Sequence, residues 1–158
     1  MSFLVDDNEK YPQFQWDTPI SQLIRDDFVL ENDYSTNHTT IEDCLSHRSG
    51  LPGHDRALGG PDATVQSVVR SLRHLPMTAE PRTKYQYCNA MFAVATHVIE
   101  TATGRKLGDL MREWIWKPLG MDSTFLDLEG AKNAKEDLAR GYRYLMILTM
   151  VALRKWSG

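Results

Sequence analysis

The sequence predicts a predominantly α-helical chain with a large share of loop and at most a small piece of sheet. Three segments place apolar residues at the three- and four-residue spacing of one helical face. Glycine and proline residues bound these segments, as expected where helices end. The chain has 158 residues, of which 42% are hydrophobic and 25% charged, so its composition is that of an ordinary globular domain.

The first 39 residues are polar and interrupted by proline, and they predict one short helix within a loop. The Asp-Thr-Pro run at residues 17–19 is typical of a helix start, and the apolar residues Ile20, Leu23 and Ile24 follow it. Further along, Thr40 and Asp43 have the spacing of a capping box, which predicts a brief helix ending at Gly50.

Glycine and proline predict that residues 50–61 are irregular. A helix should begin after Asp62, a possible N-cap, and stop before Pro76. Its apolar face comprises Val65, Val68, Val69 and Leu72. Residues 77–86 suit a connection or a short strand.

The strongest helical pattern runs from Asn89 to a C-terminal stop at Gly104. Its apolar face comprises Met91, Ala95, Val98, Ile99 and Ala102. A further helix is predicted from about Leu107 to Trp116, closed by Pro118 and Gly120. Its inward residues are Leu110, Met111 and Ile115. No element is predicted for residues 142–158.

Composition argues against several classes of partner. A formal charge of −3 and a pI near 5.9 give no attraction for nucleic acid or an anionic membrane. Residues 1–10 lack the apolar region of a signal peptide, and the apolar run at 145–153 is too short to cross a bilayer. Cys44 and Cys88 form no disulfide framework, so we expect a cytoplasmic location.

Nothing in the sequence predicts a cofactor or a metal. His47, His54 and Asp55 are potential ligands, but they lack the spacing of a known metal motif.

Three blocks occur in order along the chain: Leu45–Pro52 (LSHRSGLP), Tyr87–Asn89 (YCN) and Trp116–Thr124 (WKPLGMDST). They are similar to the SHTSGLP turn, the Y-x-N motif and the PLGM turn of the superfamily that contains class C β-lactamases, D-aminopeptidases and family VIII esterases. The resemblance covers about residues 14–142 and leaves 143–158 unassigned.

The resemblance implies an α+β fold, in which an antiparallel sheet is flanked by helices and lies beside a largely helical region. The present residues correspond mainly to that helical region. We therefore expect residues 1–158 to be a single incomplete domain with little sheet.

The resemblance also implies a serine hydrolase that acts through an acyl-enzyme on a small-molecule ester, amide or lactam. In this family an S-x-x-K motif supplies the nucleophile and a lysine, and a later K-T-G or H-x-G strand completes the oxyanion site. Tyr87 would be the catalytic proton-transfer group. Asn89 would bind the lysine and the amide or ester of the substrate.

The nucleophile motif is missing from these residues. No serine has lysine three positions later, and no K-T-G or H-x-G tripeptide follows Asn89. The nearest similar pairs, Ser67 with Arg70 and Thr103 with Lys106, lie in ordinary helical patterns. A serine hydroxyl needs a neighbouring base, and tyrosine, with a pKa of ~10, needs a nearby cation to act as one. We therefore expect a fragment that is inactive alone, with the missing motif before Met1.

Other interpretations remain open at this point. Tyr87 and Asn89 could be a helix-start pair in which Asn89 is the cap. Cys88 could be a nucleophile, although packing is the commoner role of a free cysteine. Ser46 and Ser49 lie beside His47, but sequence neighbours seldom reach catalytic geometry. The whole chain could instead be a non-catalytic binding or regulatory module derived from the family.

Overall fold

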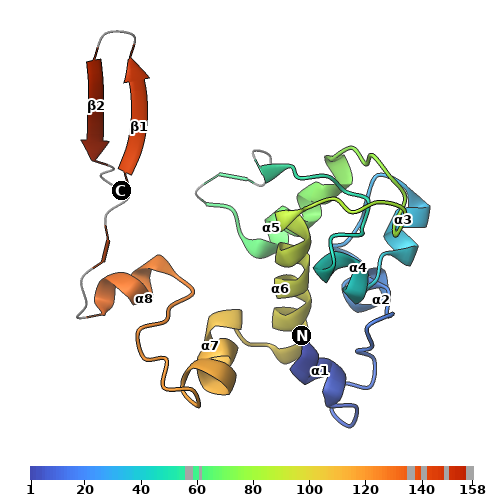
Figure 1. Cartoon of the computed structure of the whole chain (residues 1–158). Coiled ribbons are helices and arrows are strands. Elements are labelled where there is room, and N and C mark those ends of the chain that lie inside the picture. The colour runs from blue at the N-terminus through green and yellow to red at the C-terminus, as the bar shows by residue number, and fades with distance from the viewer. Residues whose placement is uncertain (56–58, 61, 135–137, 140–141, 148–149, 156–158) are drawn as a thin grey trace. The chain divides into compact units, whose positions relative to one another are not determined.

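The computed structural model describes residues 1–55, 59, 60, 62–134, 138, 139, 142–147 and 150–155 (Figure 1). The chain forms two compact units, Met1–Leu107 and Gly108–Gly158. Each unit is described by itself.

The first unit is built around one long helix, α6 (Asn89–Thr103), against which α5, α4 and α2 pack (Figure 1). The remaining elements are α1 (Ser2–Asp6), α2 (Ile20–Leu23), α3 (Asp33–His38), α4 (Ile41–Leu45), α5 (Val65–Ser71) and η2 (Leu72–His74). The largest side chains that are fully buried here are Leu4, Phe14, Ile20, Phe28, Ile41, Leu51, Val69, Leu72, Met91, Val94 and Val98. The predicted predominance of helix is confirmed in this unit.

The prediction of a single helix before residue 40 was wrong, because α1 and α3 lie there as well as α2. Helix α3 has no apolar periodicity, and its buried residues are Ser35 and Thr36. The Asn32 side chain caps it by accepting from the Ser35 amide at 2.8 Å, and the Thr36 hydroxyl accepts from the Leu30 amide at 2.9 Å. Hydrogen bonds of these polar side chains, and not an apolar face, stabilise this helix.

The capping box of α4 is confirmed, since Thr40 and Asp43 exchange both hydrogen bonds. The helix ends at Leu45 and not at Gly50, because His47 has a φ of +59° and cannot continue a right-handed helix. Helix α5 also begins with a capping box, but its N-cap is Thr64 and not Asp62. No strand is present in residues 77–86, which form turns and a connection.

Helix α6 matches its prediction closely. Met91, Ala95, Val98 and Ile99 are buried, Ala102 is half-buried, and Gly104 ends the helix with a φ of +66°. Cys88 occupies the N-cap position without a side-chain cap hydrogen bond. The interpretation of Asn89 as the cap is therefore wrong, and its side chain is free for another role.

The second unit contains α7 (Leu107–Met111) from Gly108 onward, the π-helical turn η3 (Arg112–Trp116), α8 (Leu128–Asn133) and a hairpin of β1 (Tyr142–Ile147) and β2 (Met150–Lys155). The predicted helix to Trp116 is confirmed, but its second half is π-helical. Of its predicted inward residues, Leu110 is buried, whereas Met111 and Ile115 are half-buried. Trp116 is buried as well. The antiparallel hairpin pairs Tyr142 with Lys155 and Ile147 with Met150. Helix α8 and the hairpin were not predicted. Among the described residues this hairpin is the only sheet, as the expectation of little sheet requires.

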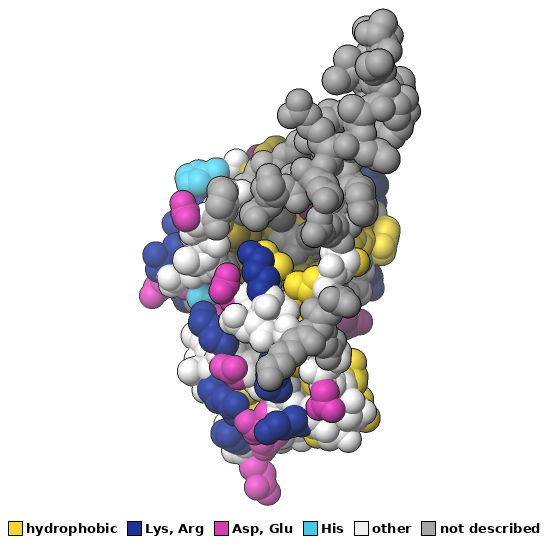
Figure 2. Space-filling model, turned by 90° about the vertical axis from the view of Figure 1, so that its left-hand side faces the viewer, with side chains coloured by type: hydrophobic (Ala, Val, Ile, Leu, Met, Phe, Trp, Pro, Cys, Tyr) yellow, Lys and Arg dark blue, Asp and Glu magenta, His cyan; other side chains and the backbone are white. Residues whose placement is uncertain are grey.

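Charge is mixed on the described surface. On the face in Figure 2, Lys and Arg side chains lie among Asp and Glu side chains, without a large area of one sign. Among the described residues, no helix combines the length and apolar character needed to cross a bilayer.

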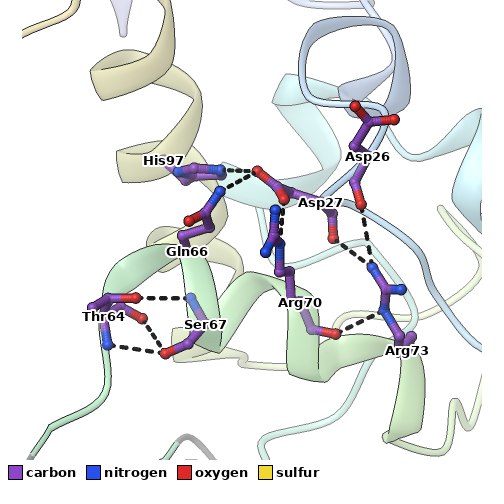
Figure 3. Close-up of polar contacts among 8 residues, drawn as sticks. All are labelled: Asp26, Asp27, Thr64, Gln66, Ser67, Arg70, Arg73 and His97. Atoms are coloured by element: carbon purple, nitrogen blue, oxygen red, sulfur yellow. Dashed lines mark hydrogen bonds and ion pairs between the residues drawn. The ribbon is translucent and has the colours of Figure 1, made fainter.

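Asp27 connects three parts of the first unit through its side chain (Figure 3). One carboxylate oxygen accepts from His97 Nε2 of α6 at 2.6 Å and from Gln66 Nε2 of α5 at 3.1 Å, and the other accepts from Arg70 of α5. The His97 nitrogen must carry the proton, because an ionised carboxylate only accepts. The loop after α2 is thereby fixed to both α5 and α6.

These contacts hold the pKa of Asp27 well below its usual range. The His97 hydrogen bond is the largest cause, Gln66 and Arg70 act in the same direction, and burial opposes them. A carboxyl with a lowered folded-state pKa stabilises the fold above its unfolded pKa of about 4, and this contribution is lost as the pH falls below that value.

We therefore expect Asp27→Asn to lower the free energy of unfolding by about 1–3 kcal/mol at neutral pH. The variant should also lose less stability than the unsubstituted chain between about pH 4 and pH 2. Urea denaturation at several pH values measures both effects. Asp26→Asn is the matched control, since Asp26 contributes only its backbone carbonyl to this network. Equal pH dependence in the two variants would contradict the assignment.

Candidate active site

The turn that follows α4 is hydrogen-bonded to the segment that precedes α6. The Gln86 amide donates to the His47 carbonyl at 2.8 Å, and Gln86 Nε2 donates to the Gly50 carbonyl at 2.8 Å. The Thr78 hydroxyl donates to Gln86 Oε1 at 2.7 Å. Two of the three sequence blocks, LSHRSGLP and YCN, are thus brought together in space.

Arg82 reinforces this pairing from the other side of the turn. Its amide donates to the Arg48 carbonyl at 2.7 Å, and its guanidinium donates to the His38 carbonyl at 2.6 Å. The same guanidinium lies 3.4 Å from Asp43, the buried carboxylate of the α4 capping box. The end of α3, the start of α4 and the connection before α6 are joined through one side chain.

Gly50 permits the close approach of the turn. Its φ is +81°, and a Cβ at this position would lie 2.2 Å from the carbonyl oxygen of Ala79. Any side chain would therefore add a steric clash to an unfavourable backbone conformation.

We expect Gly50→Ala to lower the free energy of unfolding by roughly 3 kcal/mol or more. Gly104→Ala is the matched control, because Gly104 also has a positive φ, +66°, but nothing lies within 4 Å of its Cβ position. Gly104→Ala should lower the free energy of unfolding by only about 1–2 kcal/mol, the cost of a side chain at a positive φ. Urea unfolding of both variants tests the difference, and equal losses would show that the Ala79 contact is unimportant.

His47 lies under the Y-x-N segment. Its Nδ1 accepts from the Cys88 amide at 3.2 Å. Its ring lies 5.7 Å from the ring of Tyr85, 4.5 Å from that of Tyr87 and 5.3 Å from that of Phe92, between ring centroids. The three aromatic side chains around His47, which we call the aromatic cluster, are all exposed.

Tyr87, Cys88 and Asn89 alternate in burial. Tyr87 is 57% exposed and Asn89 is exposed, whereas Cys88 between them is buried. Cys88 has extended backbone angles, φ −145° and ψ 106°, which direct successive side chains to opposite sides. The two residues that the sequence singled out are therefore presented to solvent on the outer side.

Asn89 is bound by a residue that sequence reasoning considered only as a metal ligand. Its Nδ2 donates to Asp55 Oδ1 at 3.1 Å. The contact joins residues 34 positions apart, and no motif spacing indicates it. Among the described residues, no group of three His, Cys, Asp or Glu side chains is arranged to hold a metal ion.

The other nucleophile candidates have structural roles. Ser67 forms the α5 capping box with Thr64, and the Thr103 hydroxyl donates to the Ile99 carbonyl at 2.8 Å. Ser49 is fully buried, and its hydroxyl accepts from the Leu51 amide at 3.3 Å. Ser46 has a buried hydroxyl without a hydrogen-bond partner among the described residues. None of these contacts is a serine–base pair.

Both cysteines pack in the core as free thiols, as the packing interpretation of Cys88 expects. Burial raises the pKa of the Cys44 thiol far above its usual range, and it is also the main cause of the raised pKa of Cys88. The Cys44 thiol donates to the Met91 sulfur at 3.6 Å. A thiol that resists ionisation is a poor nucleophile.

The folded chain should therefore react slowly with 5,5′-dithiobis(2-nitrobenzoic acid) at pH 8, because thiolate is scarce and inaccessible. Addition of urea should release both thiols rapidly. Following the absorbance of the released thiolate tests this expectation. Rapid reaction of one thiol in the folded protein would identify a reactive cysteine and contradict it.

Comparison with known proteins identifies the family to which this chain belongs. The β-lactamase family model matches residues 4–145, nearly the whole chain. The chain belongs to the β-lactamase family, which confirms the resemblance carried by the three sequence blocks and extends it toward both ends. The third block lies in the second unit, where Trp116 is buried and Gly120 has a φ of +66°.

The chain is also similar to individual proteins of known name. It is 55% identical over 148 residues to Unguisins hydrolase ungD′ of Aspergillus campestris, covering 91% of this chain and 28% of the relative. D-amino acid amidase of Ochrobactrum anthropi, in a structure with D-phenylalanine, is 28% identical with a TM-score of 0.66, covering 89% of this chain and 44% of that one.

A penicillin-binding protein homologue of Pyrococcus abyssi shares the fold, with a TM-score of 0.73 at 19% identity, covering 98% of this chain and 36% of that one. The chain thus spans 28% of the length of the curated relative and less than half of each of these two solved structures.

Proposed function

We propose that residues 1–158 form one incomplete domain that carries the tyrosine and asparagine side of a serine hydrolase site. The proposal rests on one observation, the exposure of Tyr87 and Asn89 on either side of buried Cys88. Tyr87 would transfer protons during acyl transfer, and Asn89 would hydrogen-bond to the substrate and to a lysine. Membership of the β-lactamase family supports both roles.

The chemistry explains why these two residues would not act alone. Tyrosine serves as a base near neutral pH only when a cation stabilises its anion. In this family the lysine of the S-x-x-K motif would be that cation, and these 158 residues do not contain the motif. Without a nucleophilic serine no acyl-enzyme forms, and removing members of such a unit costs nearly the whole rate. We infer that the 158-residue chain is inactive by itself.

The substrate would be an amide. The similarity to Unguisins hydrolase ungD′ supports unguisins as substrates of the intact enzyme, and the similarity to D-amino acid amidase supports amides of D-amino acids. Both cysteines are free thiols, which suits a reducing compartment, and a cytoplasmic location is proposed on that ground.

A fluorescent fluorophosphonate probe tests the proposal. The 158-residue chain should show no labelling above a heat-denatured control, because no activated serine is present. Labelling of Ser46 or Ser49 would contradict the proposed site. Reading the transcript upstream of Met1 provides a second test, since an in-frame S-x-x-K motif is expected there, and its absence would favour a non-catalytic binding module.

Variants of a longer chain, if the transcript encodes one with an S-x-x-K motif, then test Tyr87 itself. Tyr87→Phe should slow acylation by the probe ~10²-fold or more, the usual effect of removing a proton-transfer group. Tyr85→Phe is the matched control, because Tyr85 also contacts His47 and is exposed but has no proposed chemical role. Equal effects of the two substitutions would assign both tyrosines to packing.

A further inference from the structure

The contact between Asp55 and Asn89 fixes the orientation of the asparagine amide. Asp55 Oδ1 and Asn89 Nδ2 are 3.1 Å apart. An ionised carboxylate offers only acceptors, so the NH₂ group and not the oxygen of Asn89 must face Asp55. The Asn89 oxygen is consequently directed elsewhere, and one of its two N–H donors is occupied.

The loop that carries Asp55 is held at the site by the two residues that precede it. A Cβ at Gly53 would lie 3.2 Å from the Tyr87 carbonyl oxygen, so this backbone runs close to the Y-x-N segment. His54 Nε2 lies 3.1 Å from the Pro76 carbonyl oxygen. Asp55 therefore reaches Asn89 from a loop that is anchored at adjacent positions.

The carboxylate of Asp55 has capacity for a second ligand. The residue is exposed, only one of its oxygens bonds to Asn89, and none of the ion pairs in the part of the chain that the structure describes involves it. Burial is the main cause of the raised pKa of Cys88, and the nearby Asp55 charge adds to it. A negative charge thus lies beside the exposed side of Asn89.

We propose that Asp55 is a positioning and specificity residue, which orients the Asn89 amide and whose second carboxylate oxygen binds the ammonium group of an amino-acid amide substrate. The second role rests on the proposed function, because it places the substrate amine beside Asn89. A protonated amine would gain a charge-assisted hydrogen bond there, whereas an N-acylated substrate would lose the charge. A substrate carboxylate at this point would be repelled.

Nuclear magnetic resonance of the ¹⁵N-labelled 158-residue chain tests the positioning role without any catalysis. Asp55→Asn should shift the side-chain NH₂ signals of Asn89 more than any backbone amide outside residues 53–57 and 86–91, while Asp55→Glu should move them less. Asp62→Asn is the matched control, since it removes one negative charge from the same loop without a contact to Asn89 among those that the structure describes. Unchanged Asn89 signals in Asp55→Asn would overturn the positioning role.

Titration with two probes tests the ammonium site. D-Phenylalanine amide, which is cationic at pH 6, should bind at least about fivefold more tightly than neutral N-acetyl-D-phenylalanine amide, and Asp55→Asn should weaken the cationic probe about tenfold. The same substitution should change the affinity for the neutral probe less than twofold. A merely structural role of Asp55 would instead change the affinities for both probes alike.

A preference that survives in Asp55→Asn, or no detectable binding of the cationic probe to the unsubstituted chain, would overturn the ammonium site. The Asn89 signals test the role of Asp55, and the fluorophosphonate assay tests the proposed hydrolase function. Because the two measurements are independent, either proposal can be contradicted without the other.

Discussion

The hydrogen bonds between the turn after α4 and the connection before α6 are the constraint on which the candidate site depends. They place His47 beneath Cys88 and hold Tyr87 and Asn89 at the start of α6. The pairing needs a residue without a side chain at Gly50, since Ala79 occupies the space that a Cβ would take. Local backbone geometry, more than contacts of the two site residues themselves, therefore determines where they lie.

The buried face of α6 explains why this geometry is stable. Met91, Val94 and Val98 are fully buried, and α5 and α4 pack against the helix. Asp27 adds a polar tie to His97 on the same helix. Apolar packing and hydrogen bonds therefore hold the later turns of α6 in place. Asn89 lies in the first turn of the same helix, so its backbone position is fixed as well.

Much of this arrangement could be predicted from the sequence, and the failures have identifiable causes. The capping box of Thr40 and the apolar face of α6 are local patterns, and both are confirmed. Helix α3 was missed because it is stabilised by hydroxyl and amide side chains, which leave no periodic apolar signal. The Asp55–Asn89 contact spans 34 positions and depends on loop geometry, so no local pattern could indicate it.

The aromatic cluster has a consequence for the strength of the site. Tyr85, Tyr87 and Phe92 are 66%, 57% and 45% exposed, so water reaches the rings that surround His47. In water the dielectric constant is high and the attraction between charges is weak. A segment that covered these rings would expel that water, and every charge at the site would then act through a medium of much lower dielectric constant. The polar groups described here would then interact with a bound molecule more strongly than they do in the exposed site.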